Sequence, residues 1–181
     1  MMFKRLIPLL ALLVSCTGDN IENAYSSLPA NFVFRYCLTV PQMRAALGGS
    51  PGSFFTVRAT ADNKYIITSN DDPNNPYTYQ KDAVDQKVTY LCRSGFIIGT
   101  PVLSSSLEAY DLACPNCYQQ NISRPLVFDK DIRTRLNCPR CNCAYSLDDA
   151  QGIIVEGNGE GKVLMRYHVS YDGLNNLSVH N

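Results

Sequence analysis

The sequence predicts an all-β protein, a small antiparallel sandwich or barrel of about ten short strands. In many short segments β-branched and aromatic residues alternate with polar ones, which is the pattern of half-buried strands. Glycine, proline and asparagine interrupt these segments at short intervals, as turns require. No segment has the sustained spacing of a long amphipathic helix. These observations favour short paired strands over a helical or α/β fold.

The first half of the domain shows three strand patterns and one short helical pattern. Pro41 ends the first strand, because proline has no amide hydrogen to donate to a strand ladder. A polar segment with two prolines, Asn70–Pro76, is expected to be an exposed loop. The expected strands are Phe32–Val40, Phe54–Thr60 and Lys64–Ser69, and one or two helical turns are expected at Gln42–Leu47.

The second half continues with short strand patterns, and the last three of them are expected to form a meander with Gly- and Asn-rich turns. Two of these strands lead directly into cysteine motifs. The expected strands are Val88–Cys92, Gly95–Gly99, Leu107–Ala113, Leu126–Phe128, Arg135–Asn137, Tyr145–Asp148, Ile153–Val155, Val163–Val169 and Leu177–Val179.

The chain begins with the layout of a secretory signal. Lys4 and Arg5 precede nine mostly apolar residues, Leu6–Val14, a run too short to span a hydrocarbon layer of about 30 Å as a helix. The stretch Leu13-Val14-Ser15-Cys16 resembles the lipobox of bacterial lipoproteins, whose cysteine is acylated and becomes the mature N-terminus. The resemblance implies a protein of the cell envelope, expected at the outer membrane, held by fatty chains such as palmitate on Cys16. The alternatives are a plain signal peptide cut elsewhere, or a buried first strand.

Cleavage before Cys16 would divide the chain into a signal peptide, 1–15, a polar tether, 16–30, and a single β domain, 31–181. The mature chain would have 166 residues, with 14 basic and 16 acidic side chains. This near-neutral balance gives no support to nucleic acid as a partner, because such domains usually carry a clustered basic face. The expected partner is instead the membrane, reached through the lipid on Cys16.

Four of the eight cysteines form two Cys-Pro-x-Cys knuckles, separated by twenty residues. This spacing is typical of a zinc site. Two cysteines on one tight turn can direct both sulfurs to one ion, and a second turn completes a tetrahedron with Zn–S distances near ~2.3 Å and sulfurs within about 4 Å of one another. The expected ligands are Cys114, Cys117, Cys138 and Cys141, and the expected metal is zinc.

Other roles for the cysteines remain open. Export usually means an oxidising compartment, so the knuckles could instead form two disulfides. A redox dithiol is a further alternative, although the βαβ setting of that motif is absent. Cys143 is expected to be a spare thiol or a small buried hydrophobe. Cys37 and Cys92 lie in expected strands, where they are either a disulfide or, as we favour, unlinked core residues.

With both knuckles in place, the stretch Gly95–Val179 resembles a Rieske domain. A strand pair is followed by a first loop at Cys114, a second loop at Cys138, a further strand and a closing hairpin. The resemblance implies a small antiparallel domain over about 88–181 with two metal-binding loops, which the earlier strands would complete.

The ligand set departs from that family. A Rieske centre takes one cysteine and one histidine from each loop, but Asn116 and Cys141 stand at the histidine positions here. His168 and His180 follow both loops and are expected to be an ordinary strand residue and a tail residue rather than ligands. What remains resembles a rubredoxin-like or zinc-ribbon arrangement. An all-cysteine [2Fe–2S] cluster or a single iron stays possible, because thiolates suit zinc and iron alike.

The sequence contains no phosphate-binding glycine loop, nucleophile elbow or His-Glu-x-x-His motif. The acidic pairs Asp71-Asp72 and Asp148-Asp149 are expected to be solvated loop residues. We therefore expect a non-enzymatic, membrane-anchored envelope lipoprotein with a structural zinc. Its tyrosine-bearing strands or its 70–80 loop would face an unidentified protein or glycan. The alternative is an envelope electron carrier with an iron or iron–sulfur centre in the same thiolates.

Overall fold

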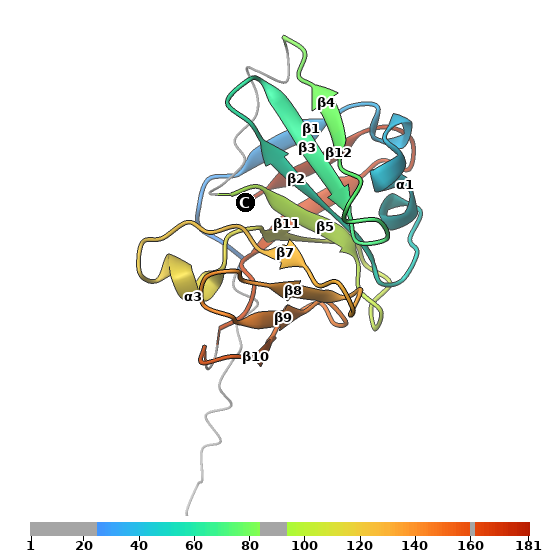
Figure 1. Ribbon diagram of the computed structural model, residues 1–181. Coiled ribbons are helices and arrows are strands. Elements are labelled where there is room, and N and C mark those ends of the chain that lie inside the picture. The colour runs from blue at the N-terminus through green and yellow to red at the C-terminus, as the bar shows by residue number, and fades with distance from the viewer. Residues whose placement is uncertain (1–24, 84–93, 160–161) are drawn as a thin grey trace, which may run out of the picture.

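Two antiparallel sheets dominate this computed structural model, which describes residues 25–83, 94–159 and 162–181. The larger sheet is strongly curled, like half of a barrel, and the smaller sheet lies below it in Figure 1. The all-β prediction is therefore confirmed. The order of the large sheet is β1 (Asn31–Phe34), β12 (Leu177–His180), β11 (Arg166–Tyr171), β6 (Glu108–Asp111), β5 (Phe96–Thr100), β2 (Ser53–Ala59), β3 (Lys64–Ser69) and β4 (Tyr77–Gln80).

The small sheet carries the two knuckles. Its order is β10 (Ile154–Glu156), β9 (Ala144–Ser146), β8 (Arg135–Asn137) and β7 (Val127–Phe128). Two short helices complete the described part of the chain: α1 (Pro41–Leu47) covers one end of the large sheet, and α3 (Pro115–Tyr118) lies beside one end of the small sheet (Figure 1). None of the helices in the described ranges is long and apolar enough to cross a membrane.

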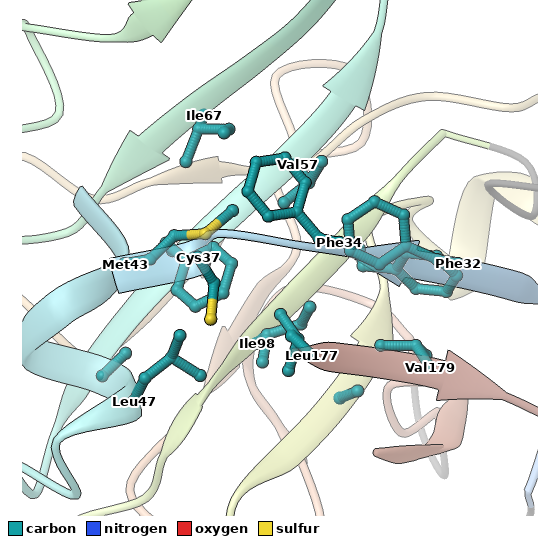
Figure 2. Close-up of a cluster of buried hydrophobic side chains, with 14 of the residues drawn as sticks. Phe32, Phe34, Cys37, Met43, Leu47, Val57, Ile67, Ile98, Leu177 and Val179 are labelled. Atoms are coloured by element: carbon teal, nitrogen blue, oxygen red, sulfur yellow. The ribbon is translucent and has the colours of Figure 1, made fainter. Parts of the chain in front are cut away.

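The inner face of the large sheet holds the main hydrophobic core. Figure 2 shows Phe32 and Phe34 of β1 beside Leu177 and Val179 of β12, with Met43 and Leu47 of α1 closing one side. All of them are buried. Alternation along β1 and β12 sends these residues inward and their neighbours outward, which is why the sequence shows a period of two.

The opposite face of the same sheet packs against the small sheet and forms a second core. Phe54, Ile97 and Tyr110, on neighbouring central strands, belong to this second cluster, whereas Phe55 and Ile98 belong to the first. Strands β2, β5 and β6 are therefore buried on both faces along most of their length. The knuckle cysteines belong to the second cluster, so the candidate metal centre is part of the packing between the sheets.

Asn70 joins the two sheets. Its side-chain oxygen accepts a hydrogen bond from the Phe54 amide at 2.8 Å, and its side-chain nitrogen donates to the carbonyls of Gly52 at 2.8 Å and Arg133 at 2.9 Å. Arg133 lies just before β8, so Asn70 ties the large sheet to the strand that leads to the second knuckle. Asn70 was expected in an exposed loop, but it is buried because three backbone groups surround its amide.

Three further expectations differ from the structure. The first strand ends at Phe34 rather than Val40, because Tyr36 adopts a left-handed conformation with φ 66° and a 3₁₀ turn follows at Cys37–Thr39. Strand β4 was not expected from the sequence. The last three strands do not form one meander: β10 pairs with β9 in the small sheet, while β11 and β12 pair in the large one. The expected strand Val88–Cys92 lies outside the described residues.

Candidate metal centre

The first knuckle is a single helical turn at the end of β6. Cys114 precedes α3, whose first residue, Pro115, suits a helix start because that position needs no amide donor. The Tyr118 amide donates to the Cys114 carbonyl at 2.9 Å and closes the turn. The Cys114 amide in turn donates to the Arg124 carbonyl at 2.8 Å, which closes the loop that follows. Cys114 and Cys117 are both buried.

The second knuckle is the tight connection between β8 and β9. The Cys138 amide donates to the Cys143 carbonyl at 2.9 Å, and the Asn142 amide donates to the Cys138 carbonyl at 3.1 Å. Asn142 adopts a positive φ of 56°, a conformation that asparagine tolerates better than most residues. The turn leaves Cys138 buried and Cys141 half-buried, at the edge of the site.

The fold brings the four expected sulfurs together. The ligand atoms of Cys114, Cys117, Cys138 and Cys141 all lie within 4.8 Å of one another. Two close contacts cross between the knuckles, with Cys114 Sγ 3.6 Å from Cys141 Sγ and Cys117 Sγ 3.6 Å from Cys138 Sγ. None of the cysteines in the described ranges forms a disulfide. These four residues could therefore hold a metal ion.

The separations fit a tetrahedral ion. Sulfurs about 2.3 Å from one central ion stand about 3.8 Å apart at the corners of a tetrahedron. The two crossing contacts, at 3.6 Å, are close to that value, while the limit of 4.8 Å for the whole set is wider than the expected 4 Å or so.

Burial and hydrogen bonding shift the pKa of Cys114, Cys117 and Cys141 in different directions. Burial raises the pKa of Cys114 to about 11 and also raises the pKa of Cys117. Burial acts in the same direction on Cys141, but hydrogen bonds from the Asn116 side chain and from Cys143 outweigh it and lower the pKa of Cys141 to about 6. A bound cation would favour the thiolate form of all four residues, so metal binding would release protons.

Two neighbours of the thiols were not recognised as part of the site from the sequence. The Tyr145 hydroxyl lies 3.6 Å from Cys114 Sγ, and burial raises the pKa of this phenol. Asn116, inside the first knuckle, donates from Nδ2 to Cys143 Sγ at 3.4 Å. The available signal for Tyr145 was its place two positions after Cys143, because residues two apart at the start of a strand such as β9 face the same way, here toward the first knuckle.

Cys143 lies beside the site but outside the group of four. It is 1% exposed, which confirms that it is a buried thiol. Gly157 packs against it so closely that an added Cβ would lie 2.9 Å from Cys143 Cα and 3.0 Å from its sulfur. Burial raises the pKa of Cys143 to about 11.

The remaining candidates lie elsewhere. Cys37 is a buried free thiol in the main core, as favoured, although in a 3₁₀ turn instead of a strand. The acidic pairs lie in turns: Asp71 pairs with Arg133 at 2.5 Å, and Asp148 accepts from Thr134 Oγ1 at 2.6 Å. His168 and His180 lie on β11 and β12, away from the group of four cysteines. Cys16 and Cys92 are outside the described residues.

Comparisons of this chain with protein-family models, with curated proteins and with solved structures each found no match.

Proposed function

We propose that this chain is a lipid-anchored lipoprotein of the cell envelope in which Cys114, Cys117, Cys138 and Cys141 hold a structural zinc ion. The observation that carries the metal site is the compact group of four thiols, three of them buried, inside the packing between the two sheets. The lipid anchor rests on the lipobox-like stretch that ends at Cys16. Zinc binds four thiolates tetrahedrally in structural sites. The ion would join the loop after β6 to the turn between β8 and β9, because each knuckle supplies two ligands.

The spacing of the sulfurs favours one ion over a binuclear cluster. A [2Fe–2S] cluster holds two thiolates on each of two irons, so the two pairs stand further apart than thiolates that share one ion. Here two of the four sulfur pairs across the knuckles lie at 3.6 Å, and all four sulfurs lie within 4.8 Å of one another, so the two pairs are not set apart. A single zinc, or a single iron, suits this arrangement better than the cluster.

A closed ligand set supports a structural role. Catalytic zinc sites keep a position free for water or substrate, whereas structural sites take all four ligands from the protein. Four sulfurs surround the present site, and Cys114, Cys117 and Cys138 are at most 2% exposed. Because the order of the loops resembles that of a Rieske domain, an iron-based electron carrier is the competing function that the test below must distinguish.

The test is metal content and stability in a matched pair of variants. The mature protein should contain about one zinc per chain, be colourless and unfold more readily after treatment with a chelator. Cys117→Ser should lose the metal and lower the midpoint of unfolding. Cys37→Ser makes the same change at a buried free thiol in the other core and should keep the metal.

Two results would contradict structural zinc. Visible absorption bands that bleach reversibly with dithionite would make the centre an iron site and the protein an electron carrier. If the protein contains no metal and its knuckle cysteines resist alkylation after unfolding, the knuckles form disulfides and do not bind zinc.

The anchoring is tested separately. Cys16→Ser should abolish fatty-acid labelling and release the protein from membranes, or leave the precursor uncleaved. Labelling of that variant at the wild-type level would rule out lipid on Cys16, without bearing on the metal.

A further inference from the structure

The two histidines of the chain lie directly opposite each other on the large sheet. His168 of β11 and His180 of β12 are partners in the antiparallel register. Their ring centroids are 5.6 Å apart, and the angle between the ring planes is 28°. Both residues are exposed. The pairing of these two strands was expected as a closing hairpin, but the contact between the two histidines, which stand twelve positions apart in the sequence, was not.

Both imidazoles project from the outer face of the sheet. The next residues along the strands, Val169 and Val179, pair with each other, and their side chains pack on the main core. Two positions from the histidines, Ser170 Oγ and Ser178 Oγ lie 2.7 Å apart and are again on the outer side. Alternation along both strands therefore holds the two imidazoles on the same solvent-facing surface.

Tyr25 restricts the position of the His168 ring. The two ring centroids are 3.9 Å apart and the planes differ by 15°. Tyr25 is held in place because it bridges to Arg166 of β11, and because the Ser26 amide donates to the Arg166 carbonyl at 2.7 Å. Stacking covers a face of the imidazole and leaves the nitrogens at its edge free to bind. No hydrogen bond joins either imidazole to another described residue.

The separation of the rings suits two ligands of one ion. An imidazole nitrogen binds zinc at about 2.0–2.1 Å, so two rings on one tetrahedral ion have centroids about 5.3 Å apart. The observed separation is 5.6 Å. Arg166, two positions before His168, stacks over Tyr25 at 5.2 Å, and its charge is balanced by Glu108, whose Oε2 lies 2.6 Å from Arg166 Nη2.

We propose that His168 and His180 form a second metal site, separate from the cysteines, for a divalent ion that prefers imidazole: copper(II), nickel(II) or zinc(II). The two imidazoles would fill two positions and water the others. The site is open to solvent, so it would exchange its ion readily, in contrast to the buried thiolates. It does not depend on the function proposed above.

The test uses nickel(II), because copper(II) would also oxidise thiols. The full mature protein, with its cysteine site loaded with zinc, is titrated with nickel(II) by equilibrium dialysis at about pH 7.5, where free imidazole is mostly neutral. His168→Gln and His180→Gln should each weaken nickel binding by roughly tenfold or more, because only one imidazole would then bind the ion. Ser170→Ala, on the same face, is the matched control and should bind like the wild type.

Location is checked by the paramagnetic broadening of amide signals in the NMR spectrum. It should centre on Tyr25, His168 and His180. The proposal is overturned if either single histidine variant binds nickel within twofold of the wild type, or if broadening centres on the knuckles. It is equally overturned if the wild type binds no nickel. Unchanged thermal unfolding of the two variants would show that a loss of binding is not a loss of fold.

Discussion

Replacing Asn70 by alanine tests whether one side chain couples the large sheet to the small one. Asn70 is 7% exposed and makes three hydrogen bonds to backbone groups: the Phe54 amide and the carbonyls of Gly52 and Arg133. The substitution removes all three bonds at once. It also leaves a small space that is lined by polar atoms, which water can enter only in part.

The expected loss follows from these contacts. One hydrogen bond contributes a net 0.5–1.5 kcal/mol or so, and a buried group left without a partner costs about 1–3 kcal/mol. Because water can reach part of the space left behind, we expect Asn70→Ala to lower the free energy of unfolding by about 2–4 kcal/mol. Asn70→Asp keeps the acceptor for Phe54 but sets a carboxylate against two carbonyls, so it should be no more stable than the alanine variant.

Urea unfolding of the zinc-loaded protein measures this loss. Asn74→Ala, an exposed position in the same loop, is the matched control and should change stability by less than about 0.5 kcal/mol. An Asn70→Ala variant as stable as the control would refute the assignment of Asn70 as a link between the sheets. A large loss in both variants would show instead that the whole loop matters.

Three further changes probe the cores. Burial raises the pKa of Cys37 to about 11, so its contribution to stability is complete below the unfolded-state pKa of about 8.5 and is lost as the pH rises toward 11. The free energy of unfolding should therefore fall more between pH 8 and pH 10.5 or so in the wild type than in Cys37→Ala. Gly99→Ala should destabilise by at least about 2 kcal/mol, because its Cβ would lie 2.2 Å from the Ser53 carbonyl oxygen on the paired strand. Phe32→Ala, at a fully buried position, should lower the free energy of unfolding by about 3–5 kcal/mol.

The same urea experiment serves all three changes. Val33→Ala is the control for Phe32, because Val33 is only half-buried on the other face of β1, and it should cost about 1 kcal/mol or less. An equal pH dependence in Cys37→Ala and the wild type would contradict the role assigned to that thiol. A wild-type midpoint for Gly99→Ala would mean that β2 and β5 can separate without cost.

Some local features could be predicted because their causes are local. The knuckles follow from two Cys-Pro-x-Cys turns, whose short spacing and proline restrict the backbone wherever the turns lie. Strands such as β3 and β8 follow from alternation, since a strand with one buried face needs a period of two. Strand β4 was missed because it is only four residues long and directly follows the proline-containing loop, although its two tyrosines alternate with polar residues.

By itself the sequence determined the all-β class, most of the strands and the four cysteines that meet, because these depend on neighbours along the chain. Only the tertiary structure decided which sulfurs lie across from each other and that His168 faces His180. It also decided that Asn70 is buried rather than exposed. The physical reason is that strand order and register minimise the free energy of the whole fold. Packing on both faces of the large sheet determines the strand order and register, so they cannot be predicted from any short segment of the sequence.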